Sequence, residues 1–194
     1  MLRFLLHVLI TVWLGFLTAV AVFSHQPESL ENWKGLDTPT KPASPDVWER
    51  IEQSVLNRTT PLVITEAEAN HYLAAAITGR QTGLSAHLAE FERVALHFEK
   101  NLCRLCFVWN TGGKTRTASV DFSIHREKKE YVVEPLRGHY GRLPVFRGAL
   151  AALIPGMQEL CGALKNEIRS VFEMNVIRIE EGRVILDPRF EATK

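Results

Sequence analysis

Apolar residues follow three different patterns along the chain, and the first is an unbroken run. It extends from Phe4 to Phe23, with His7 as its only ionisable residue. As a helix, twenty such residues span roughly 30 Å, which is the thickness of the hydrocarbon core of a bilayer. We therefore predict a transmembrane anchor or a signal peptide in residues 1–24.

Helical spacing of apolar residues follows in the next part of the chain. The sequence Ser-Pro-Asp at 44–46 is typical of a helix start, and the apolar positions in 47–56 then lie on one helix face. Thr65 and Glu68 have the spacing of a capping box, which predicts a second helix over 66–77. Both glutamates of its first turn are interpreted as groups that cap the helix and complement its dipole.

Alternation with a period of two replaces helical spacing in the middle of the chain. It predicts strands over 94–98, 103–109, 116–125 and 131–136, with a hairpin turn at 110–114. One face of the third strand is polar, and we expect that face to be exposed to water. It comprises Thr117, Ser119, Asp121 and Ser123. The pattern indicates an antiparallel meander with one apolar face.

Helical spacing returns after the glycines at 138 and 141. A helical region is predicted from Leu143, followed by a long amphipathic helix over 157–172 and a terminal hairpin over 176–186. The predicted fold class is α+β: a curved antiparallel sheet packed around a long C-terminal amphipathic helix, preceded by an N-terminal transmembrane helix. Residues 45–194 are long enough for one domain with its own core.

The charges that flank the apolar run suggest an orientation in the membrane. Arg3 precedes the run, and Glu28 and Glu31 follow it, so the positive-inside rule places the domain outside the cytoplasm, in a periplasmic or extracellular location. Ala19-Val20-Ala21 resembles a cleavage site, which leaves a cleaved secreted form as the alternative to an anchor. Residues 25–44 contain three prolines and are expected to form an extended, unpacked tether.

Composition and motifs narrow the function classes. The net charge of +1, from 23 basic and 22 acidic residues, argues against a nucleic-acid partner. The sequence contains no GxSxG, P-loop or HExxH motif, so we predict no enzyme activity, no cofactor and no metal site. Asp121 and His125 share a strand face but lack a suitable nucleophile. The three cysteines are Cys103, Cys106 and Cys161. Cys103 and Cys106 lie three apart on a strand and therefore face opposite ways, which favours buried thiols over a disulfide that involves Cys161 or a metal or redox site.

An apolar stretch near Pro144 and Pro155 is the candidate binding site. It is either a helix packed in the core or the lip of an apolar groove, and the groove would be a site for lipid or another apolar ligand. The predicted ligand-binding residues are Leu143, Val145, Phe146, Leu150, Leu153, Ile154, Met157 and Leu160.

Three segments also resemble a known group of proteins. Residues Ile64–Leu73 are similar to the T-E-x-E-x-N-x-Y-L opening of small membrane-anchored bacterial proteins of unknown function. Tyr140–Val145 contains their G-x-L-P turn, and Val176–Leu186 matches their closing hairpin. More loosely, residues 60–188 resemble the TULIP-like lipid-binding superfamily. That resemblance implies a curved sheet around a long helix, with an apolar channel.

Two functions agree with these features. The first is a membrane-anchored extracytoplasmic binding domain for lipid or another apolar ligand, whose partner is the membrane. The alternative is a non-enzymatic accessory or interaction subunit of an envelope assembly, with a protein partner that the sequence does not identify. In that case the polar strand face or a sheet edge would contact the partner.

Overall fold

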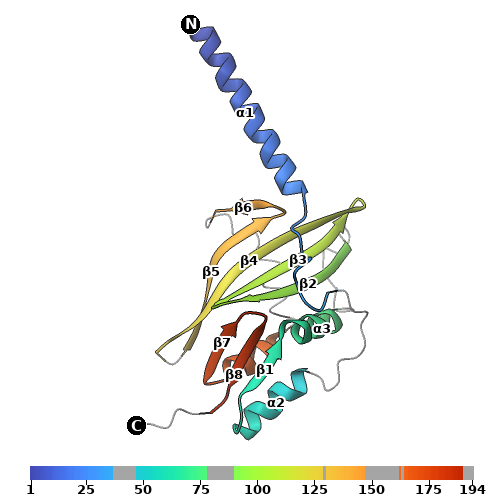
Figure 1. Ribbon diagram of the computed structural model, residues 1–194, viewed down its shortest axis with the longest axis vertical. Helices are drawn as coiled ribbons and strands as arrows, with labels where there is room; N and C mark the ends of the chain where they lie inside the picture. The colour runs from blue at the N-terminus through green and yellow to red at the C-terminus, as the bar shows by residue number, and fades with distance from the viewer. Residues whose placement is uncertain (37–46, 78–89, 129, 147–161, 163, 190–194) are drawn as a thin grey trace.

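The computed structural model describes residues 1–36, 47–77, 90–128, 130–146, 162 and 164–189, and it has an α+β architecture (Figure 1). The first helix, α1, extends away from a domain that contains two antiparallel sheets. The further described helices are α2 (Val47–Asn57), α3 (Glu66–Ile77) and α5 (Lys165–Phe172). The larger sheet has the order β2-β3-β4-β5-β6 and the smaller one the order β1-β8-β7.

Helix α1 (Leu2–His25) contains the apolar run. Its residues Arg3–His25 are long and apolar enough to cross a membrane, and none of the apolar window is buried against the domain. An N-terminal helix of this kind fits either a single-pass anchor or a signal sequence.

The five-stranded sheet is the meander that the alternating pattern predicts. Its long strands are β2 (Glu90–Glu99), β3 (Leu102–Thr111), β4 (Lys114–Glu127) and β5 (Glu130–Tyr140). The β3–β4 turn contains Gly112 and Gly113 with φ of 59° and 74°, as a tight hairpin requires. The last strand, β6 (Leu143–Val145), corrects the predicted helix start, because Leu143 pairs with Tyr140 and Val145 with Gly138. Pro144 is tolerated there because β6 is an edge strand.

The smaller sheet contains the predicted terminal hairpin and one strand that the sequence pattern did not predict. The hairpin comprises β7 (Val176–Glu180) and β8 (Arg183–Asp187), and β1 (Leu62–Thr65) pairs with β8. One core lies between this sheet and α2, where Val47 and Ile51 pack with Ile64, Met174 and Leu186.

A second core fills the space between the inner face of the larger sheet and helices α3 and α5. It is formed by Val94 and Leu105 of the sheet, Leu73 of α3 and Leu164, with Ile168 of α5 packed against it. The prediction of a long C-terminal helix over 157–172 is wrong, because α5 has only eight residues. Leu164 precedes α5 with φ −108° and ψ 24°, outside helical geometry, so α5 begins at Lys165.

The two described cysteines lie on opposite faces of β3, as the strand geometry predicts. Cys103 packs with Phe98 and Ile179 on the inner face, whereas Cys106 packs with Trp33 and Ala95 on the outer face. Both are free, buried thiols. Burial raises the pKa of Cys103 well above its usual value and that of Cys106 to about 12. Both side chains are therefore neutral components of the core.

Candidate functional site

The segment that follows α1, residues 26–36, is packed on the outer face of the larger sheet, and we call it the strap. In Figure 1 it runs from the base of α1 past the strands toward α3. Trp33 is 7% exposed and packs against Ala95, Cys106 and Val108, with Leu30 and Leu36 beside it. The prediction of an unpacked tether over 25–44 is therefore wrong for this part, because apolar side chains hold the strap on the sheet. Residues 37–44 lie outside the described residues.

A carboxylate of the strap is inserted into the polar face of the sheet. Glu28 Oε1 accepts a hydrogen bond from Arg104 Nη1 at 3.0 Å, and Glu28 Oε2 accepts one from Ser119 Oγ at 2.7 Å. The backbone N–H of Glu28 donates to Thr117 Oγ1 at 2.8 Å. Each polar side chain of the sheet that meets Glu28 is thus satisfied by the strap.

Beneath Glu28 lies a buried ion pair between β3 and β4. Asp121 is 0% exposed, and its Oδ2 accepts from Arg104 Nη2 at 3.0 Å. Arg137 Nε lies 3.2 Å from the same oxygen, from a largely exposed side chain. The pKa of Arg104 is raised, first by its hydrogen bonds to Asp121, so this guanidinium stays charged.

This packing corrects the expected water-facing side of β4. Thr117, Ser119 and Asp121 are buried rather than exposed, and Ser123 is half-buried. The alternation of the strand was predicted correctly, but the polar side chains bind Glu28 and Arg104 in place of water. Asp121 and His125 do not form the acid–imidazole pair that the sequence suggested. The carboxylate near the imidazole is that of Glu127, whose Oε1 lies 3.6 Å from His125 Nε2.

The end of α1 is docked directly on the turn between β5 and β6. The N–H of Arg142 donates to Phe23 O at 3.0 Å, and Arg116 Nη1 donates to His25 O at 3.2 Å. Gly141 has φ 59°, and a Cβ at this residue would clash with Gln26 O. Only glycine fits so close an approach. Helix α1 is thus joined to the domain by hydrogen bonds and tight packing.

A second polar cluster joins α3 to the edge of β2. Asn70 is 2% exposed; its Oδ1 accepts from Leu96 N–H at 2.6 Å, and its Nδ2 donates to Leu96 O at 2.9 Å. Glu66 is 1% exposed, and its Oε2 accepts from Phe98 N–H at 3.1 Å. Gly182 N–H donates to Phe98 O. These contacts satisfy backbone groups that an edge strand would otherwise leave unpaired.

The same two α3 side chains also hold the strap. Lys34 N–H donates to Glu66 Oε1 at 2.8 Å, and Asn70 Nδ2 donates to Lys34 O at 2.8 Å. Next to Lys34, Gly35 has φ 82°, and a Cβ there would lie 2.7 Å from Ala67 Cα. His97 Nδ1 lies 2.9 Å from Glu66 Oε2, and the His97 ring stacks on Trp33 with centroids 5.2 Å apart.

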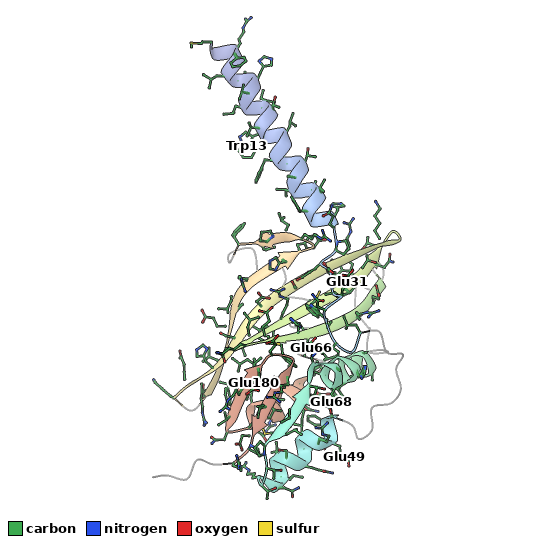
Figure 2. The ribbon with its side chains drawn as sticks, in the orientation of Figure 1. Trp13, Glu31, Glu49, Glu66, Glu68 and Glu180 are labelled. Carbon is green, nitrogen blue, oxygen red and sulfur yellow. The ribbon has the colours of Figure 1, made fainter. Side chains whose placement is uncertain are left out.

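Glu66 was interpreted only as a helix-capping group, and its role here was missed. Figure 2 shows it between α3 and the larger sheet. Glu68 does form the predicted capping box, because its N–H donates to Thr65 Oγ1 and its Oε2 accepts from Thr65 N–H. The polar residues of the motif at 64–73 are therefore structural: Tyr72 OH, for example, donates to Glu167 Oε1 of α5 at 2.8 Å.

The predicted ligand-binding residues divide into two groups. Leu143 and Val145 are half-buried in β6, and Phe146, directly after β6, is 77% exposed. The other predicted residues, Leu150, Leu153, Ile154, Met157 and Leu160, lie outside the described residues. The structure therefore leaves the apolar groove a prediction.

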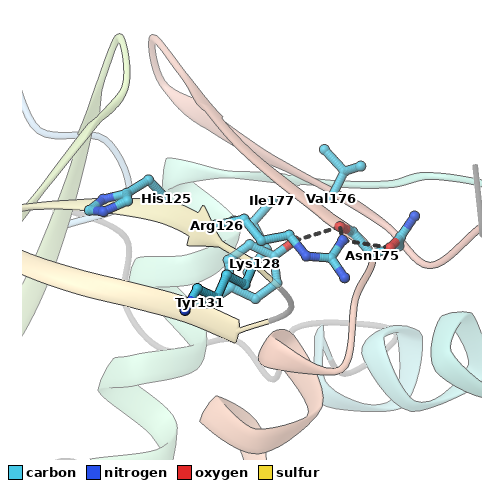
Figure 3. Close-up of a pocket in the computed structure, with 7 residues that line it drawn as sticks. All are labelled: His125, Arg126, Lys128, Tyr131, Asn175, Val176 and Ile177. Carbon is cyan, nitrogen blue, oxygen red and sulfur yellow. Dashed lines mark hydrogen bonds between the residues drawn. The ribbon is translucent and has the colours of Figure 1, made fainter.

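An open pocket of about 540 Å³ (Figure 3) lies beside the β4–β5 turn, which is at the end of the larger sheet far from α1 in Figure 1. Its walls come from β4, β5 and the start of β7. Arg126 Nη1 donates to Asn175 O and Oδ1, and Tyr131 OH donates to the same backbone oxygen at 2.7 Å. These bonds join β4 and β5 to the smaller sheet. The lining residues are His125, Arg126, Lys128, Tyr131, Asn175, Val176 and Ile177.

The described residues contain no group of three or more His, Cys, Asp or Glu side chains that could hold a metal ion. The fold and the junction together define an α+β domain with an N-terminal apolar helix whose last turn contacts the β5–β6 turn. No family model and no curated protein matches the chain.

Proposed function

We propose that the chain is a membrane-anchored, non-enzymatic interaction domain that serves as an accessory subunit of an envelope assembly. Helix α1 is its retained anchor, and the domain lies outside the cytoplasm. The observation that carries the proposal is the packed junction. The strap is held by Glu28, Trp33 and the backbone of Lys34, and the end of α1 is docked on Gly141.

A packed junction matters because it sets both height and orientation. A domain on a flexible linker of similar length samples many positions above the bilayer. Here the chain bonds to the sheet within a few residues of the last turn of α1. A fixed orientation benefits a protein that must present one surface to a partner that is itself embedded in the same membrane.

The partner surface in this proposal is a sheet edge. The polar face of β4 is already covered by the strap, and α3 satisfies the edge of β2. In the described part of the chain, β1 pairs only with β8, and β6 pairs only with β5. The outer edge of β6 can accept a strand from another chain. Backbone groups of β1 already have partners, because Arg50 Nη2 donates to Val63 O at 2.9 Å and Thr65 N–H donates to Glu68 Oε2 at 2.8 Å.

The hypothesis of an apolar ligand is less well supported. Among the described residues, side chains from β2, β3 and α3 fill the space between sheet and α5. The resemblance to TULIP-like proteins remains a prediction, and the eight-residue α5 removes the long central helix that it implied.

Site-specific photo-crosslinking in native membranes tests the proposal. A crosslinking amino acid at the exposed Phe146, beside β6, is expected to capture one discrete membrane partner. A flexible insertion of about six Gly and Ser residues between Gln26 and Pro27 frees the domain from α1. It should abolish the crosslink, whereas the same insertion between Gly112 and Gly113 should preserve it.

Two results would contradict the proposal. One is the absence of any discrete crosslinked partner from the β6 edge in membranes. The other is a crosslink that persists after the insertion at the junction, because fixed orientation would then have no role. Protease accessibility of the domain in intact cells separately tests its side of the membrane, and carbonate extraction tests whether α1 is retained as an anchor.

A further inference from the structure

The end of the larger sheet nearest α1 carries basic and aromatic side chains. It consists of the β3–β4 turn and the β5–β6 turn, both close to the base of α1 in Figure 1. Lys114 and Arg142 are exposed there, and Arg116 is half-buried. Trp109 and Tyr140 lie beside them, with ring centroids 5.9 Å apart. We call this surface the membrane-proximal end.

Hydrogen bonds fix the level of these side chains relative to α1. The Arg142 N–H bonds Phe23 O, and Phe23 is the last residue of the apolar run. Arg142 Nε donates to Pro27 O at 3.3 Å, and Arg116 Nη1 donates to His25 O. Both guanidinium groups therefore lie where α1 leaves the hydrocarbon core and meets the lipid headgroups.

The carboxylates nearby have other partners or lie farther away. Glu28 accepts from Arg104 and Ser119, and Glu92 is paired with Arg93 at 3.2 Å. Glu31 is farther along the strap from α1 (Figure 2). The membrane-proximal end thus combines positive charge with Trp and Tyr rings, which is the composition that favours the headgroup region.

We infer that the membrane-proximal end binds the phosphate groups of anionic lipids in the bilayer that holds α1. Lys114, Arg116 and Arg142 supply the positive charge, and Trp109 and Tyr140 contact the region between headgroups and acyl chains. This inference rests on the proposed retention of α1 as an anchor. It adds a lipid contact that presses the domain onto the bilayer surface.

Fluorescence quenching in nanodiscs tests the inference with the full-length chain. Thr111, exposed beside the β3–β4 turn, is replaced by Cys and labelled with NBD in a Cys161→Ser background. Cys103 and Cys106 are buried and stay unlabelled. The nanodiscs contain phosphatidylcholine alone or with about one third phosphatidylglycerol, plus a lipid spin-labelled on its headgroup. Quenching is expected to be stronger in the anionic discs.

Charge variants identify the residues responsible. Because a basic residue near an anionic surface contributes about fivefold to binding, Arg116→Gln with Arg142→Gln should remove most of the phosphatidylglycerol-dependent quenching. Arg116→Lys with Arg142→Lys keeps the charge but alters the hydrogen bonds to His25 of α1 and to Pro27 of the strap, and it should retain the quenching. Lys128→Gln, at the opposite end of β4, is the matched control and should change nothing.

Equal quenching in neutral and anionic discs would overturn the inference, as would a Gln variant that behaves like the parent chain. Failure of the Lys variant to retain the quenching would also overturn it, because the arginines would then serve only to cap α1. If α1 were not an anchor, the chain would not co-purify with nanodiscs. That separate outcome would contradict the proposed function and is distinguishable from a change in quenching.

Discussion

Ser119 of β4 and Glu28 of the strap are joined by a hydrogen bond of 2.7 Å, although 91 residues separate them in the chain. Ser119 is 0% exposed, so its hydroxyl group meets this carboxylate in place of water. The contact converts a polar strand face into a binding surface for the chain's own N-terminal segment. The predictions below test this arrangement and the elements around it.

Replacing Glu28 by Ala should destabilise the domain by about 1–3 kcal/mol, because a buried hydroxyl and a guanidinium N–H lose their acceptor. Chemical denaturation of the full chain in detergent measures the change. Glu31→Ala, on an exposed residue of the same strap, should alter the free energy of unfolding by less than about 0.5 kcal/mol. Equal effects of the two substitutions would show that Glu28 does not hold the strap.

Asp121→Asn should have a larger effect, about 3–5 kcal/mol, because it leaves Arg104 with less compensating charge in the interior. Arg137→Gln removes the exposed partner of Asp121 and should cost less than about 1 kcal/mol. A triple variant, Glu28→Gln with Arg104→Met and Asp121→Leu, should be more stable than Asp121→Asn, since it removes the three charges that pair with one another at this site. Thermal unfolding of the parent chain and the three variants provides the comparison. A triple variant no more stable than Asp121→Asn would contradict the coupling.

Gly141→Ala and Gly113→Ala form a matched pair. Both residues have positive φ, 59° and 74°, so each substitution carries a backbone cost of about 1–2 kcal/mol. Only at residue 141 does the new Cβ meet carbonyl oxygens at the end of α1. We expect Gly141→Ala to add protease cleavage between α1 and the sheet, which Gly113→Ala should leave unchanged. Similar cleavage of both variants would argue against tight packing at the junction.

Trp33→Ala should expose one cysteine and leave the other protected. Trp33 covers Cys106 on the outer face of β3, whereas Cys103 lies in the inner core with Phe98. Alkylation at pH 8, followed by peptide mass spectrometry, should give at least tenfold faster modification of Cys106 and unchanged modification of Cys103. The control is Trp48→Ala, whose side chain packs in the other core. Faster modification of both thiols after Trp33→Ala would indicate general unfolding.

Glu68 should contribute a pH-dependent part of the stability. Burial raises its pKa, but hydrogen bonds from Thr65 and the pair with Arg50 outweigh this effect, so the pKa lies below the ordinary value of 4.5. Its stabilisation is therefore complete above the pKa of the unfolded chain and is lost as the pH falls through the lowered folded value. Glu68→Gln should flatten the stability curve between about pH 5 and pH 3. An unchanged slope in the Glu68→Gln chain would contradict this contribution.

Local patterns predicted the elements whose cause is local. The capping box of Thr65 and Glu68 needs residues three apart, and the β3–β4 turn needs two adjacent glycines. The alternation in β4 likewise identified which side chains share a face. These features depend on short stretches of sequence, so a single sequence is sufficient to find them.

Features that depend on distant partners were missed. Strand β1 has four residues and exists because it pairs with β8, more than a hundred residues later. Strand β6 depends on pairing with β5, so Leu143 and Val145 looked like the start of a helix. The polar face of β4 was identified correctly, but its cover by Glu28 was not predicted, because nothing in the strand itself specifies it.

The two buried α3 residues were missed for a related reason. A glutamate in the first turn of a helix usually faces water and complements the dipole. Glu66 instead accepts from Phe98 and Lys34, and Asn70 sits one turn later on the same side. The spacing of four between two polar residues was the available signal, because it places them together beside whatever the helix packs against.

The strap also constrains the order in which the molecule assembles. During synthesis, residues 26–36 leave the ribosome long before β3 and β4, which form their binding surface. The strap therefore cannot take its final position until the hairpin between those strands is complete, and contacts of such wide sequence separation form slowly. If α1 is already inserted in the bilayer by then, the sheet must pack against a strap whose N-terminal end is held at the membrane by α1. The last step of folding would then take place at the membrane surface.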